Sequence, residues 1–150
     1  MISRIRQRTK ADCALCVVAM VMGQPYTYER VLADSLRYPK WDSDGKFPAW
    51  WETYLREQGF KAVYCSCSQL PLISTFGGNV VAVLGMNIPS HEASHVVAVD
   101  ECGVVDPADG APDHVSLSEY IPSRIAQGVV FDDEFLAVNV PRQQSVAGVT

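Results

Sequence analysis

The sequence lacks any apolar run of the roughly 18 residues that a membrane-spanning helix needs. It also lacks a run rich in Lys and Arg, and its formal net charge of -5 argues against generic nucleic-acid binding. The basic N-terminus, MISRIRQRTK, leads into an apolar segment that is interrupted early and ends without a small-residue cleavage site. We therefore predict no signal peptide, no membrane or nucleic-acid partner, and a cytoplasmic location.

A complete disulfide framework is also missing. The five cysteines are an odd number, which fits free thiols in a reducing compartment. The chain has no internal repeat and no linker, and its 150 residues with 48% apolar content are typical of one globular domain. We expect a single domain over residues 1–141 and a flexible tail over 142–150. The oligomeric state stays open.

The predicted helices come first in the chain and the predicted strands second. Helices are expected over residues 13–22, 28–36 and 48–58, with Gly23 and Gly59 as end signals. Strands are expected at 61–65, 79–84, 95–100, 104–105 and 135–140, and a capping box predicts a short helix from Ser116. This order predicts an α+β domain in which N-terminal helices pack on an antiparallel sheet.

The first predicted helix opens on a cysteine. Asp12 is a good N-cap residue, so Cys13 is expected in the first turn, where unpaired backbone N–H groups and the helix dipole favour a thiolate. A reactive sulfur on a rigid helix is what nucleophilic catalysis requires. The alternative is that Cys13 and Cys16 are both ordinary buried cysteines, and Cys16 is expected in the core.

Three further residues could complete a catalytic site around Cys13. His95 can take the thiol proton and later protonate a leaving amine. Asp106 can orient the imidazole, because the two residues are expected at facing ends of adjacent antiparallel strands. Gln7 lies six residues before the cysteine, and its amide can donate to an oxyanion beside the sulfur.

Four short features therefore follow one another in the chain: Gln7, Asp12-Cys13, His95 and Asp106-Pro107. This set resembles the papain-like cysteine peptidases, and more narrowly the bacteriocin-processing, double-glycine leader peptidases and their stand-alone relatives. The resemblance spans roughly residues 4–107. Ala14 departs from it, because family members usually carry Gly directly after the nucleophile.

The resemblance implies a papain-like fold and a peptidase that forms a covalent acyl-enzyme on Cys13. It implies His95 as base, Asp106 as orienting residue and Gln7 in the oxyanion hole, with a peptide or protein substrate and no cofactor or metal. Some stand-alone relatives transfer acyl groups and others have lost activity. Acyl transfer and a non-catalytic peptide- or protein-binding module on the same fold therefore remain alternatives.

The sequence also offers two candidate zinc sites. Residues 91–95 read HEASH and match the H-E-x-x-H pattern of zinc metalloproteases, whose chemistry needs the motif on a helix. Pro89 before the motif and the predicted strand after it disfavour that helix. Cys65 and Cys67 could join Cys102 and His114 in a structural site, although C-x-C is not the usual zinc-knuckle spacing.

Three tryptophans have no assigned role in these predictions. Trp51 is expected to pack the third helix against the core, whereas Trp41 and Trp50 could pack there or line a substrate groove.

Overall fold

The structure is a computed structural model that describes residues 2–9, 12–38, 50–91, 93–108 and 110–140. Helices and an antiparallel sheet make up these ranges, so the predicted α+β class is confirmed. The helices are α1 (Cys13–Met22), α2 (Tyr28–Ser35), α3 (Trp50–Glu57) and α4 (Leu117–Ala126), with 3-10 segments η1 (Cys67–Phe76) and η2 (Pro89–His91). The strands are β1 (Lys61–Ser66), β2 (Val80–Ile88), β3 (Ala93–Asp100), β4 (Gly103–Val105), β5 (Val130–Phe131) and β6 (Glu134–Asn139).

The sheet has the strand order β1-β6-β2-β3-β4, and every pairing in it is antiparallel. β5 pairs with β2 through Met86 and Asn87, beyond the stretch of β2 that β6 covers. β4 lies at one end of the order and pairs with β3 from Ala98 opposite Val105 to Asp100 opposite Gly103. Because β3 and β4 run in opposite directions, the start of β3 and the end of β4 lie at the same end of the sheet.

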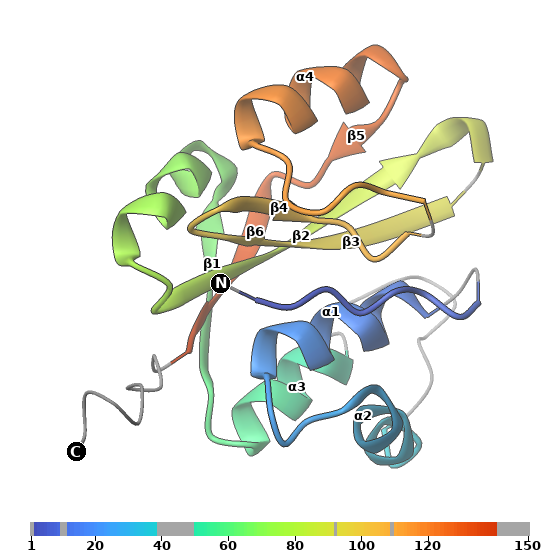
Figure 1. Cartoon of the computed structure of the whole chain (residues 1–150), viewed down its shortest axis with the longest axis vertical. Helices are drawn as coiled ribbons and strands as arrows, with labels where there is room; N and C mark the ends of the chain where they lie inside the picture. The colour runs from blue at the N-terminus through green and yellow to red at the C-terminus, as the bar shows by residue number, and fades with distance from the viewer. Residues whose placement is uncertain (1, 10–11, 39–49, 92, 109, 141–150) are drawn as a thin grey trace.

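Two cores cover the two faces of this sheet. On one face, Val96 and Ala98 of β3 pack with the buried residues of α1, α2 and α3. On the other face, Val97 and Val99 pack against η1 and α4. Figure 1 shows the same three layers, with α1 to α3 below the strands and η1 and α4 above them. Strands buried on both faces read as continuous apolar runs, which explains why the sequence identified β2 and β3.

The N-terminal arm, residues 2–9, lies beside β4 and the loop that follows it (Figure 1). The Ile2 N–H donates to Asp100 Oδ2 at 2.8 Å, and Arg4 Nη2 donates to the Ala108 carbonyl at 2.9 Å. Further along, the Gln7 N–H donates to the Pro107 carbonyl at 2.8 Å. The arm therefore joins the edge of the sheet to the start of α1.

The structure extends β2 beyond the predicted strand. The sequence predicted a loop from Gly85, because Gly, Asn and Pro favour turns, yet β2 continues to Ile88. Met86 and Asn87 each pair with β3 on one side and β5 on the other, so both edges of the strand are hydrogen-bonded there. The sequence did not predict β5, because a strand of two residues is too short to show the alternation of apolar and polar side chains.

Some predictions concern residues outside the described ranges. These are the loop at 39–45, the start of the third helix at Pro48, the role of Trp41 and the tail at 142–150. Trp51 is buried in the core as predicted, and Trp50 packs against it. Among the described residues, no helix combines the length and apolar character needed to cross a bilayer.

Candidate active site

Cys13 is the first residue of α1, as the sequence predicted. The helix is buried on every side from Cys16 to Met22, so it is embedded between the sheet and the other helices. Cys13 itself is only half-buried. The sulfur therefore lies at the accessible N-terminal end of a rigid helix, where the dipole favours negative charge.

His95 and Asp106 form a buried hydrogen-bonded pair. His95 lies near the start of β3, and Asp106 directly follows β4, so the antiparallel pairing brings them together. His95 Nε2 lies 2.7 Å from Asp106 Oδ1. The two residues are 9% and 8% exposed, so water contributes little screening to the pair.

The Cys13 thiol lies within hydrogen-bonding range of the same imidazole. Asp106 occupies Nε2, which leaves Nδ1 as the ring nitrogen available to the sulfur. Burial lowers the pKa of His95, but the hydrogen bonds and charges of Asp106 and Cys13 outweigh it and raise the pKa to about 9. The imidazole is therefore protonated near neutral pH and places a positive charge beside the Cys13 sulfur.

Asp106 is held by more than the histidine. The Ala108 N–H donates to Oδ1 at 2.9 Å, and the Tyr120 hydroxyl of α4 donates to Oδ2 at 2.8 Å. Burial raises the pKa of Asp106, but the hydrogen bonds from His95, Ala108 and Tyr120 outweigh it and hold the pKa below its ordinary value. Asp106 is therefore ionised, and Nε2 of His95 carries the hydrogen that it donates.

Tyr120 is a site residue that the sequence reasoning missed. It is 8% exposed, and burial together with the Asp106 charge raises the pKa of its hydroxyl, which therefore stays protonated as a donor. A signal was available, because Leu117, Tyr120 and Ile121 follow helical spacing and a buried tyrosine hydroxyl needs a partner. The sequence did not indicate which partner.

Gln7 is brought to this end of the sheet through its backbone bond to the Pro107 carbonyl, one residue after Asp106. Its side-chain Nε2 donates to the Thr9 carbonyl at 3.2 Å. A glutamine amide carries two hydrogens, so this bond leaves one for another acceptor. The role of Gln7 in an oxyanion hole stays a prediction.

Asp12 is the N-cap residue of α1, as the sequence predicted, but its side chain makes no cap bond to the helix. Its backbone carbonyl accepts from the Cys16 N–H at 3.1 Å, while its carboxylate turns away from the helix. Oδ2 accepts from the Arg8 N–H at 2.9 Å and from the Tyr28 hydroxyl at 2.8 Å, and Oδ1 accepts from the Thr9 N–H at 3.2 Å. Two donors from the preceding turn and one from α2 therefore take the place of the cap bond.

The metalloprotease alternative is wrong on geometry. The reaction needs both histidines of H-E-x-x-H on one face of a helix, but His91 ends η2 and His95 lies in β3. His95 is also bonded to Asp106 through Nε2.

The second zinc alternative lacks support as well. His114 Nε2 lies 2.9 Å from Asp100 Oδ2, so its partner is a buried carboxylate. Cys65 belongs to β1, whereas Cys67 begins η1 and its thiol donates to the Asp132 carbonyl at 3.1 Å. Within the described ranges, no group of three or more His, Cys, Asp or Glu side chains could hold a metal ion.

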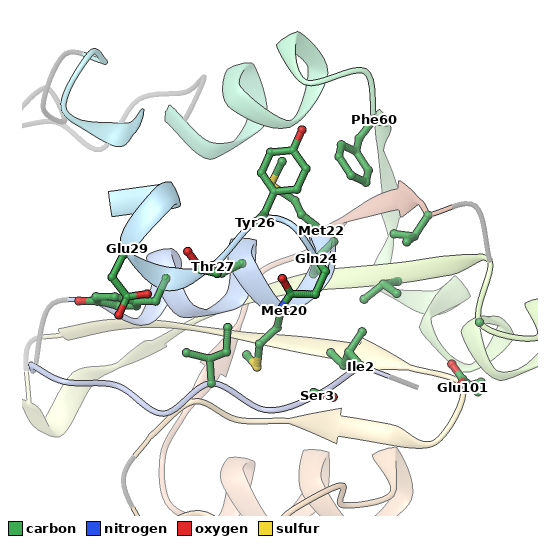
Figure 2. A pocket seen from close by; sticks show the side chains of 18 of the residues that line it. Ile2, Ser3, Met20, Met22, Gln24, Tyr26, Thr27, Glu29, Phe60 and Glu101 are labelled. Carbon is green, nitrogen blue, oxygen red and sulfur yellow. The ribbon is translucent and has the colours of Figure 1, made fainter. Parts of the chain in front are cut away.

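A separate groove of about 810 Å³ lies between the N-terminal arm, the second half of α1 and the start of α2. Figure 2 shows Met20 and Met22 inside it, Tyr26 and Phe60 along one side, and Ile2 along the other. Its lining includes none of the four predicted site residues: Gln7, Cys13, His95 and Asp106. The groove is therefore distinct from the Cys13 centre.

No protein-family model matches the chain, and a comparison with curated proteins finds no match. A functional conclusion therefore depends on the arrangement of Cys13, His95 and Asp106.

Proposed function

We propose that this chain is a papain-like cysteine peptidase, or a related acyl-transferring hydrolase, that acts on a peptide or isopeptide bond. The observation that carries the proposal is the position of His95, bonded to Asp106 through Nε2 and within reach of the Cys13 thiol. A helix that begins at the cysteine and packs on the strand that bears the histidine supports a papain-like arrangement.

In the proposed reaction, the Cys13 thiolate attacks the carbonyl carbon of the scissile bond. The carbonyl oxygen becomes an oxyanion, which accepts hydrogen bonds from the Gln7 amide and a backbone N–H. His95 then gives its proton to the leaving nitrogen, the C–N bond breaks, and an acyl-enzyme remains on Cys13. Water, or an amine in the acyl-transfer version, attacks this thioester and releases Cys13.

The test is the pH dependence of iodoacetamide labelling at Cys13, located by peptide mass mapping, in the wild type and in His95→Ala. Labelling of Cys13 in the wild type is expected to be fast at about pH 6, where an ordinary thiol is almost fully protonated. His95→Ala should remove this fast labelling. Exposed Cys102 is the internal control, because its rate should be the same in both proteins.

Peptide turnover is tested with a peptide library and mass spectrometry. The wild type should produce cleaved or acyl-transferred peptides, and Cys13→Ala should produce none while retaining the same circular dichroism spectrum. Products formed at comparable rates by both proteins would contradict the mechanism.

A non-catalytic peptide- or protein-binding module is the second candidate. The observation that favours it is the groove in Figure 2, which is large and mostly apolar and lies apart from Cys13. Slow labelling of Cys13 that does not depend on His95 would favour this candidate over the peptidase.

A further inference from the structure

Asp12 precedes Cys13, yet its carboxylate accepts hydrogen bonds from the N-terminal arm. It is 4% exposed and accepts both backbone N–H groups of the turn at Arg8 and Thr9. Those are the two residues that directly follow Gln7. Backbone N–H groups bonded to a buried carboxylate have little freedom to move, because leaving any of them unpaired is costly.

The contacts continue from this turn to the Gln7 side chain. The Thr9 N–H donates to Asp12, and the Thr9 carbonyl accepts from Gln7 Nε2. On its other side, the Gln7 backbone donates to the Pro107 carbonyl beside Asp106. Gln7 is thus linked through Thr9 to Asp12, which precedes Cys13, and is hydrogen-bonded directly to Pro107, which follows Asp106.

Tyr28 of α2 is the third hydrogen-bond donor to the Asp12 carboxylate. Its hydroxyl donates to Oδ2 at 2.8 Å, and both residues are buried. The Arg8 guanidinium lies 4.0 Å from the centre of the Tyr28 ring and pairs with Glu29 at 2.7 Å, which ties the same turn to α2. The sequence reasoning gave no role to Tyr28.

We propose that Asp12 is a positioning residue that holds the Gln7 amide ready for the oxyanion, with Tyr28 holding Asp12, and this inference rests on the function proposed above. Asp12 touches neither the substrate nor the reacting atoms in this arrangement. Loss of this positioning should therefore slow only the steps that develop an oxyanion.

Two reagents for Cys13 separate oxyanion stabilisation from thiolate formation. Iodoacetamide reacts by displacement, so the new S–C bond replaces the C–I bond and no oxyanion forms. With p-nitrophenyl acetate, the sulfur attacks the carbonyl carbon and a tetrahedral oxyanion forms. The C–O bond then breaks, p-nitrophenolate departs with the negative charge, and a thioester remains. The first reaction reports the Cys13–His95 pair alone, and the second also reports the oxyanion donors.

The variants are Tyr28→Phe, Asp12→Asn and Gln7→Ala, with Tyr26→Phe as the matched control. The Tyr26 hydroxyl bonds to Gln58 Oε1 at 3.0 Å, away from Asp12, so its loss should change neither reaction. Gln7→Ala should slow acylation by about a hundredfold, the typical loss for one oxyanion donor. Tyr28→Phe and Asp12→Asn should slow it by about tenfold, since a misplaced donor is less effective than a well-placed one.

Alkylation by iodoacetamide should not slow in these three variants. Asp12→Asn also removes a negative charge that opposes the Cys13 thiolate, so its alkylation should be as fast as in the wild type or faster. Acylation at the wild-type rate in both Tyr28→Phe and Asp12→Asn would overturn the inference. So would an equal loss in the two reactions, because that would indicate an effect on the thiolate or on folding.

The failure of the proposed function would look different. If Cys13 in the wild type is acylated no faster than exposed Cys102, the peptidase proposal and this inference fall together. If the wild type is acylated fast at Cys13, Gln7→Ala is acylated slowly, and Asp12→Asn and Tyr28→Phe are acylated at the rate of Tyr26→Phe, the inference alone fails.

Discussion

His95 is nine-tenths buried, and burial by itself favours a neutral imidazole. The charge state instead follows from its two partners. Asp106 supplies a carboxylate that is itself kept ionised by Tyr120 and Ala108, and Cys13 supplies the second partner. The result is a buried imidazolium that is paired with the Asp106 carboxylate on one side and faces Cys13 on the other.

The pKa of His95, followed by NMR of the imidazole carbon-bound protons, is therefore expected at about 9 in the wild type. Asp106→Asn should lower it more than Cys13→Ser does, because Asp106 contributes more to the upward shift. His114, which pairs with Asp100 and not with this site, serves as the control resonance. A pKa for His95 near 6.5 in all three proteins would contradict the arrangement.

The starts of three helices differ in how they are capped. Thr27 caps α2, and its hydroxyl accepts from the Arg30 N–H at 3.2 Å, as the sequence predicted. Ser116 was expected to open a capping box, but its side chain makes no cap bond to α4 and instead lies 3.2 Å from the Ser118 hydroxyl. The Asp12 carboxylate bonds to the N-terminal arm and makes no cap bond to α1.

Thr27→Ala is accordingly expected to lower the free energy of unfolding by about 1 kcal/mol, because one N–H at the start of α2 loses its acceptor. Ser116→Ala is the matched control, since both residues are exposed, and its effect should stay within about 0.5 kcal/mol. Urea denaturation of the two variants and the wild type gives both values. A loss in Ser116→Ala as large as that in Thr27→Ala would contradict the assigned caps.

The buried pair also links the stability of the whole protein to pH. The folded-state pKa of His95 lies above the unfolded value of 6.5, so its contribution is complete below about pH 6.5 and is lost as the pH rises towards about 9. The pKa of Asp106 is lowered by folding, so its contribution is present above the ordinary carboxyl range and is lost in acid.

A folded-state thiolate at Cys13 would offset this loss, because it binds one proton fewer than the unfolded thiol. We therefore expect the free energy of unfolding of Cys13→Ser to fall between pH 6.5 and pH 9, with a steeper slope than in the double variant that also carries Asp106→Asn. Urea denaturation in the presence of a reductant, at several pH values in this window, provides the comparison. Buried Cys16, whose pKa is raised to about 12 by burial, is present in both proteins, so its titration cancels in the difference. Equal slopes would show that the pair is not coupled to folding.

Much of the fold could be predicted from local patterns. The apolar runs of β2 and β3, the helical spacing after Cys13 and the end signal at Gly23 each follow from the neighbours of a residue in the chain. The extension of β2 past Gly85 could not be predicted, because it depends on pairing with β5, forty-five positions away at Met86 and Phe131. Turn-forming residues continue a strand when both neighbouring strands satisfy their hydrogen bonds.

The sequence by itself determined the order of helices and strands and indicated Cys13, His95 and Asp106 as candidate site residues. Residue type, helix position and strand spacing are local properties, so they can be recognised without the tertiary structure. Only the tertiary structure decided that Asp12 serves the arm rather than α1, that Tyr120 holds Asp106, and that His114 pairs with Asp100. The contacts of Tyr120 and His114 each span 14 positions of the chain, and Asp12 turns to the nearby arm in a loop that is also held by Tyr28 of α2. A side chain with several possible donors takes the partner that packing places nearest, and no local pattern specifies that choice.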